Sequence, residues 1–196
     1  MKLFDKLIEQ SRNPQGFLGY IMLKMMNVSY FNISKAALKE LNPGNRVLDI
    51  GCGGGQVLSL LAKNKNFSFV VGIDTSKTAL QLSEKKNHLF IKKGIMKIIH
   101  AEVENLPFEN SCFDAVTCFN THFHWQNLIA GLSEIRRVLK ANGQLLIVAE
   151  YHKLCYHLQE NNNNGTEQLL RQMDFNITSS LQRSAFMIIV AEKKQD

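Results

Sequence analysis

Cysteine is scarce and scattered in this 196-residue chain. The four cysteines form no Cys-x-x-Cys pair, and their spacing is not that of a zinc site. We therefore expect reduced thiols and no metal centre. The positions are Cys52, Cys112, Cys118 and Cys155.

Long apolar runs are also missing. No stretch approaches the roughly 20 residues that span a bilayer, and residues 1–6 lack the uninterrupted apolar block of a signal peptide. Hydrophobic residues make up 45% and charged residues 20% of the chain, as in an ordinary globular protein. With no internal repeat, the sequence predicts one domain over residues 1–196, without a membrane anchor and located in the cytoplasm.

The net charge is +6, which raises the question of an anionic partner such as RNA. Nucleic-acid surfaces interleave arginine and aromatic residues with lysine, and that pattern is absent here. The interpretation as a solvated basic surface is therefore favoured over nucleic-acid binding. The lysines in question are Lys63, Lys65, Lys85, Lys86, Lys92, Lys93 and Lys97.

The most informative segment that is present is residues 47–55, Val-Leu-Asp-Ile-Gly-Cys-Gly-Gly-Gly. An apolar strand delivers Asp49 and then a turn almost without side chains, where a ligand can lie against the peptide groups. Residues 56–63 have the apolar spacing of a helix, whose free N–H groups point back toward that turn. This arrangement is typical of a nucleotide-binding turn.

A second acidic residue, Asp74, ends the next β-branched strand. A carboxylate there can accept hydrogen bonds from the two hydroxyls of a ribose, as in proteins that bind dinucleotides or S-adenosyl-L-methionine. The dinucleotide pattern Gly-x-Gly-x-x-Gly needs a glycine at Gln56. The pattern Asp-x-Gly-x-Gly-x-Gly is met in full by Asp49, Gly51, Gly53 and Gly55.

Alternating apolar patterns predict strands near 46–50, 69–73, 96–100, 114–119 and 144–150, with helices between them. This order is typical of a mainly parallel sheet covered on both faces. Helices are also expected at 17–26 and 34–41, and a short one at 166–173 after a polar loop at 159–165. Residues 175–181 and 184–191 are predicted to form a hairpin with its turn near Gln182 and Arg183, and Met187 to Val190 to insert within the sheet.

With these motifs in place, the sequence resembles the class I S-adenosylmethionine-dependent methyltransferases, in particular the small single-domain members with Asp-x-Gly-Cys-Gly-x-Gly. The resemblance covers Asn45 to Val148 and includes four further segments in the family's order: residues 72–76, 101–108, 111–116 and 135–146. It implies a Rossmann-like, doubly wound α/β fold with a mainly parallel seven-stranded sheet, an antiparallel C-terminal hairpin and N-terminal helices. Residues 1–44 are then a helical cap, and residues 45–196 the cofactor-binding core.

The resemblance also implies S-adenosyl-L-methionine as cofactor and S-adenosyl-L-homocysteine as product. Asp49 is expected to hold the methionine ammonium, Asp74 the ribose, and Glu102 with the Val103 N–H the adenine. Thr75 occupies a position that more often carries an apolar side chain against the adenine. The remaining cofactor positions are Gly51, Cys52, Gly53, Gly55, Phe119 and Asn120.

Methyl transfer from a sulfonium needs alignment and desolvation, plus a base where the acceptor is protonated. His122 and His124, just after the fourth strand, are weak candidates for that base, with packing of the loop as the favoured alternative. The pair also has His-x-His spacing, but no third metal ligand is evident. Tyr20 and Met22 are weak candidates for contact with the acceptor, together with the segment 151–158.

The sequence leaves three functions open. The leading one is methyl transfer to a small molecule, because the Asn/Asp-Pro-Pro-Tyr/Phe tetrapeptide used on planar amino groups is absent and no large substrate domain is inserted. The alternatives are an RNA methyltransferase and a cofactor-binding protein without catalysis. Neither the acceptor nor the oligomeric state can be read from the sequence.

Overall fold

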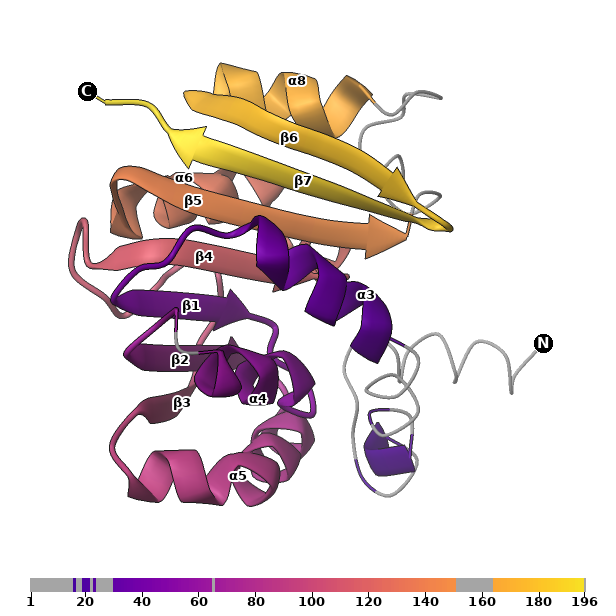
Figure 1. Ribbon diagram of the computed structural model, residues 1–196, viewed down its shortest axis with the longest axis vertical. Coiled ribbons are helices and arrows are strands. Elements are labelled where there is room, and N and C mark those ends of the chain that lie inside the picture. Colours follow the sequence, from indigo (N-terminus) through magenta and orange to yellow (C-terminus); the bar gives the residue numbers. More distant parts are fainter. Residues whose placement is uncertain are drawn as a thin grey trace.

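The computed structural model describes residues 16, 19–21, 23, 30–64, 66–150 and 164–195. In this part of the chain, seven strands form one sheet in the order β3-β2-β1-β4-β5-β7-β6 (Figure 1). The first five strands run parallel, whereas β7 is antiparallel to both of its neighbours. The strands are β1 Arg46–Ile50, β2 Phe69–Asp74, β3 Met96–His100, β4 Phe113–Phe119, β5 Leu139–Glu150, β6 Phe175–Arg183 and β7 Phe186–Lys193.

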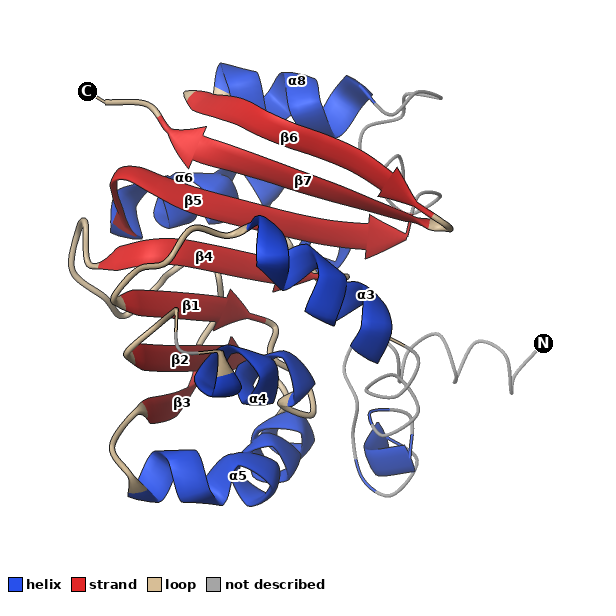
Figure 2. Cartoon of the chain, viewed as in Figure 1, coloured by secondary structure: helices blue, strands red, loops and turns tan. Residues whose placement is uncertain are grey.

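Helices cover both faces of the sheet (Figure 2). On one face, a buried cluster joins Leu48 and Val71 of the sheet to Ile135 of α6 and Leu170 of α8. On the other face, a second cluster joins Val47 of the sheet to Ala37 of α3 and Leu58 of α4. These strands are therefore buried on both sides, as the apolar runs predicted. The helices are α3 Phe31–Ala37, α4 Gln56–Lys63, α5 Lys77–Lys92, α6 Leu128–Val138 and α8 Asn164–Gln172, with 3-10 turns at Leu38–Glu40 and His122–His124.

The strand order reverses direction between β1 and β4. After β1 the chain crosses to β2 on one side, and only later returns to β4 on the other. Loops that leave the carboxyl ends of these two strands diverge, so open α/β sheets bind ligands at such a point. Asp49 lies there, level with Gly72 of β2 and Thr117 of β4.

Two predicted boundaries near the C-terminus are wrong. Gln182 and Arg183 belong to β6, where they pair with β7, and the turn falls at Ser184 and Ala185 instead. Ser184 adopts a φ of 54°, which a small polar residue tolerates in a tight turn. The insertion of β7 between β5 and β6 is confirmed.

Three other elements begin earlier than predicted. The helix expected at 34–41 is α3 from Phe31 followed by a 3-10 turn, and α8 starts at Asn164, so the predicted polar loop ends two residues sooner. Strand β5 begins at Leu139, which pairs with Phe113 before the register shifts. An irregular strand of this kind breaks the apolar alternation from which strands are predicted. Within the described residues, no helix combines the length and apolar character that crossing a membrane requires.

Candidate functional site

The glycine loop after β1 forms the floor of the site. Gly51 and Gly53 have φ values of 66° and 51°, in the left-handed region that favours glycine. A Cβ at Gly51 would lie 2.4 Å from Thr121 Cγ2, so a side chain is excluded there. The Cys52 N–H donates to Ile73 O at 2.9 Å and ties the loop to β2.

Asp74 connects the end of β2 to this loop. Its Oδ2 accepts the Gly53 N–H at 2.8 Å, and its Oδ1 accepts the Ser76 N–H at 2.8 Å. Burial raises the pKa of Asp74, although the N–H donors of Ser76 and Gly53 oppose that effect. The two carboxylate oxygens together offer about four lone-pair sites, so the group can still accept a hydroxyl of a ligand beside its backbone N–H donors.

Asp49 is the most buried carboxyl group of the site, with 2% of its surface exposed. Burial raises its pKa from 3.8 to about 7; the hydroxyl of Thr117, which donates to Asp49 Oδ1 at 2.6 Å, lowers it, and the charge of Asp74 raises it. Asp49 lies in the wall of a small pocket of about 70 Å³, together with Tyr30 and Ser34. At neutral pH this carboxyl group can therefore be held with or without its proton, depending on the ligand.

The main cleft, of about 440 Å³, lies over the carboxyl ends of β1, β2 and β4. It adjoins the small pocket, since Leu23, Gly51, Gly53 and Phe119 line both. The described lining of the two includes no lysine or arginine, although the chain as a whole is basic. Its acidic residues are Asp49, Asp74, Glu102 and Glu104.

Most predicted cofactor residues come together in this cleft. Thr75, Glu102, Val103, Phe119 and Asn120 all line it. Within that set, Glu102 is exposed and Val103 is buried. The segments that follow β2, β3 and β4 therefore supply three different walls of one site.

Asn120 has a second function in the fold. It adopts a φ of 53°. Its N–H donates to Val148 O at 2.7 Å, and its Oδ1 accepts the Glu150 N–H at 2.9 Å. The side chain therefore joins the ends of β4 and β5 at the mouth of the cleft.

Besides Asp49, two predicted cofactor residues lie apart from the main cleft. Cys52 is buried in the wall of the small pocket, and burial raises the pKa of its thiol. Gly55 is in neither lining; its carbonyl accepts the Asn87 Nδ2–H at 3.0 Å, and a Cβ there would lie 2.4 Å from Ser83 Oγ. The structure therefore places Gly55 where α5 packs closely on the loop.

The two candidate histidines differ in their surroundings. His122 is buried and packs edge-on against Phe123 and Trp125, with ring centroids 5.4 Å and 6.4 Å away. His124 lines the main cleft. Of the predicted acceptor contacts, Tyr20 packs against the cluster formed by Leu23, Ala79 and Leu82. Met22 and the segment 151–158 lie outside the described residues.

Sequence reasoning missed several residues of the site. His100, at the end of β3, lines the cleft, and its Nε2 lies 3.0 Å from Thr75 O. Tyr30 lines the small pocket and donates to Glu150 Oε1 at 2.5 Å. Burial raises the pKa of Tyr30, and the hydrogen bond to Glu150 adds to the effect. His100 stands at the end of β3, and Glu150, the partner of Tyr30, stands at the end of β5. These positions at strand ends are the only signal in the sequence that could have indicated the two contacts.

Metal binding has no support in the described part of the chain, where no three His, Cys, Asp or Glu side chains are grouped as metal ligands. The geometry does fit a nucleoside cofactor. The glycine backbone leaves room for ligand atoms, and Asp74 presents acceptors beside it.

Comparisons with known proteins agree with this geometry. Residues 48–147, just over half of the chain, match a family model described as a methyltransferase domain. A demethylmenaquinone methyltransferase from Thermotoga maritima is 31% identical over 148 residues, which cover 76% of this chain and 60% of that protein. The chain therefore spans less than two thirds of that relative.

Two solved structures share the fold. A SAM dependent methyltransferase from Aquifex aeolicus aligns with a TM-score of 0.71 and 19% identity, covering 88% of this chain and 97% of the other. A putative methyltransferase from Haloferax volcanii, solved in complex with the Trm112 methyltransferase activator, aligns with a TM-score of 0.76 and 16% identity, covering 89% and 94%. The predicted Rossmann-like fold is thus confirmed. The cofactor of the family is S-adenosyl-L-methionine, and the chain belongs to the methyltransferase domain family of class I enzymes.

Proposed function

We propose that this protein transfers a methyl group from S-adenosyl-L-methionine to a small molecule that carries no strong negative charge. The observation that carries this proposal is the pairing of Asp74 with the Gly53 N–H at the floor of an acid-lined cleft. That pairing puts the ribose acceptor and the glycine backbone side by side.

Different residues of the cleft bind different parts of the cofactor. Asp74 binds the ribose, Asp49 binds the ammonium directly or through water, and Glu102 with the Val103 N–H binds the adenine. When bound, the cofactor supplies a methyl group on a positively charged sulfur. Phe119 and Trp125, both in the lining, give the cleft apolar surface.

The charge of the cleft supports the choice of acceptor. An anionic acceptor such as an RNA backbone would approach carboxylates with no lysine or arginine among the described lining residues to offset them. The exposed lysines Lys92, Lys93 and Lys97 lie on the last turn of α5, just after it and on β3, outside the cleft lining. The related Thermotoga maritima protein is named for demethylmenaquinone, a small molecule.

Alignment is the main contribution that this chain makes to catalysis. Holding donor and acceptor in line removes much of the entropic barrier to the displacement. His124 is the better-placed of the two candidate bases, because it lines the cleft whereas His122 is buried among aromatic rings. Tyr20 and Met22 stay predicted contacts of the acceptor.

Two measurements test the proposal. Calorimetry should detect binding of S-adenosyl-L-homocysteine without comparable binding of NAD. D74A should weaken that binding more than T75A, because the ribose loses hydrogen bonds to a charged acceptor, worth about 1.5–3 kcal/mol each. Equal losses in two folded variants would show that Asp74 is not the ribose partner.

A methyl-transfer screen then separates the candidate functions. With methyl-labelled cofactor, a panel of neutral and cationic metabolites should yield a labelled product, whereas structured RNA should not. Labelling of RNA with a steep salt dependence would support the RNA methyltransferase instead. Tight cofactor binding with no acceptor in either panel would support a cofactor-binding protein without catalysis.

A further inference from the structure

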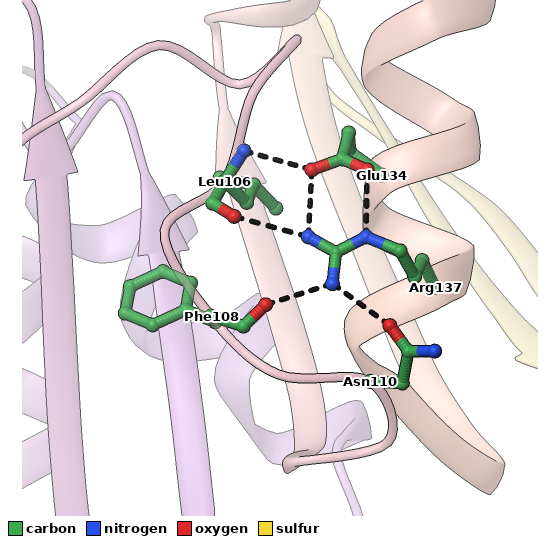
Figure 3. Close-up of polar contacts among 5 residues, drawn as sticks. All are labelled: Leu106, Phe108, Asn110, Glu134 and Arg137. Atoms are coloured by element: carbon green, nitrogen blue, oxygen red, sulfur yellow. Dashed lines mark hydrogen bonds and ion pairs between the residues drawn. The ribbon is translucent and has the colours of Figure 1, made fainter.

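Residues 101–110, which form most of the loop between β3 and β4, are attached to α6 by side chains of that helix (Figure 3). The loop carries Glu102 and Val103, the proposed adenine contacts. Glu102 is exposed, and its side chain makes no hydrogen bond with the described residues. Its position is therefore set by the backbone of its own loop.

Arg137 of α6 makes most of these contacts. Its Nη2–H donates to Leu106 O at 3.0 Å, and its Nη1–H donates to Phe108 O at 2.7 Å and to Asn110 Oδ1 at 2.9 Å. Figure 3 shows the guanidinium directed at all three loop residues at once. Only a planar, many-donor group can serve such a set, so lysine is not an equivalent replacement.

Glu134, one helical turn earlier, completes the arrangement. It pairs with Arg137 through two contacts of 2.7 Å, and its Oε2 also accepts the Leu106 N–H at 2.8 Å. Both backbone polar groups of Leu106 are thus satisfied by side chains of α6. We call Glu134 and Arg137 the loop clamp.

A second attachment lies at the other end of α6. Glu104 Oε1 accepts the N–H groups of Gln126 and Asn127 at 2.7 and 3.2 Å, just before the helix begins. A Cβ on Gly131 of α6 would lie 3.3 Å from Val103 Cγ1, which shows how closely helix and loop approach. The loop is therefore held at both ends of one helix. The same loop contains Glu102 and Val103, the proposed adenine contacts, so these attachments also fix their position.

We propose that Arg137 is a positioning residue for recognition of the adenine amino group. The loop clamp fixes the backbone of residues 101–110, so that the Glu102 carboxylate faces the 6-amino group of the cofactor. This inference rests on the proposed function, in which Glu102 binds the adenine. Arg137 itself does not touch the cofactor and acts through the loop.

The experiment measures selectivity rather than affinity alone. Calorimetry compares S-adenosyl-L-homocysteine with its inosine analogue, which has an oxygen in place of the 6-amino group. The wild type should prefer the adenine compound, and R137M should lose about tenfold in affinity for it while binding the analogue nearly as before. R137K keeps the charge but not the fork of donors, so its affinity for the adenine compound should lie between those of the wild type and R137M. R137K replaces R137M in the test if R137M does not fold.

K140M is the matched control. Lys140 pairs with Asp114 at 2.7 Å, a salt bridge of similar exposure to that of Arg137 with Glu134, but it joins the beginnings of β4 and β5 rather than the loop of residues 101–110. Its loss should lower the melting temperature while leaving the preference for the adenine compound unchanged. If R137M lowers only the melting temperature, as K140M does, the clamp has no positioning role and the proposal is overturned.

E102A separates this inference from the function on which it rests. If E102A keeps the preference for the adenine compound, Glu102 is not the adenine partner, and that part of the proposed function fails. If E102A loses the preference and R137M retains it, the inference about Arg137 alone is overturned. In the double variant, R137M should add little to E102A, since both act on the same contact.

Discussion

The pKa of Asp49 makes the stability of the cofactor-free protein depend on pH. The carboxyl group is 2% exposed, and its pKa is about 7 in the folded protein against an ordinary value of 3.8. Because the folded state holds the proton more tightly, stability is unaffected below about pH 4 and falls as pH rises toward 7. At about 1.4 kcal/mol per pKa unit, the loss approaches about 4 kcal/mol above pH 7.

D49N should remove this loss. The amide resembles the protonated carboxyl group and keeps an oxygen that can accept the hydroxyl of Thr117. Urea unfolding followed by circular dichroism should show free energies of unfolding for D49N and wild type that differ by only about 1 kcal/mol at about pH 4.5. At about pH 8 the variant should be more stable, by up to about 4 kcal/mol.

D114N provides a control of opposite sign. Burial of Asp114 acts to raise its pKa, but the bonds from Lys140 and from the N–H groups of Arg46 and Asn45 outweigh it and lower the pKa. D114N should therefore lose stability at pH 8 rather than gain it. If D49N differs from wild type by the same amount at both pH values, Asp49 does not hold its proton and the reasoning is refuted.

Further predictions concern the glycine loop, the histidines and cofactor binding. G55A should cost at least about 3 kcal/mol of unfolding free energy, because φ is 74° and neighbouring atoms lie within 2.4–2.9 Å of the new methyl group. G94A is the control, since Gly94 has a similar φ of 71° but open space around it, and it should cost about 1 kcal/mol. H122Q should lower the melting temperature, because that ring is buried, whereas H124Q should leave it nearly unchanged; loss of turnover in H124Q with intact cofactor affinity would identify it as the base. Calorimetric affinity for S-adenosyl-L-homocysteine should rise between about pH 5 and 7 as Asp49 ionises, and D49N should not show this rise.

The strands and the glycine loop were predictable because local pattern determines them. Two-sided burial leaves continuous apolar runs such as those of β1 and β2, and the loop needs glycine where its backbone turns left-handed. Asp74 was predictable for the same reason, since it follows directly from the end of a strand. Hairpin turns were less so, because Gln182 and Arg183 are polar on an exposed strand and look like turn residues.

Contacts between distant segments could not be predicted. Arg137 binds carbonyl groups of Leu106 and Phe108, and any residue type could supply those carbonyls. Gly55 looked like part of the cofactor loop, but its partners are Asn87 and Ser83 on α5, about 30 residues later in the chain. Helical periodicity shows which face of α5 is buried without showing what covers it.

The acidic lining of the cleft also bears on how the proposed reaction would end. The methyl donor enters with a positive sulfur, and its product leaves with a neutral one. Carboxylates at Asp49, Asp74, Glu102 and Glu104 attract the donor more strongly than the product, because only the donor carries that charge. In the proposed reaction, the attraction between the cleft and its cofactor therefore weakens when the methyl group is transferred. The fixed charges of the cleft then favour replacement of the product by a new molecule of the methyl donor.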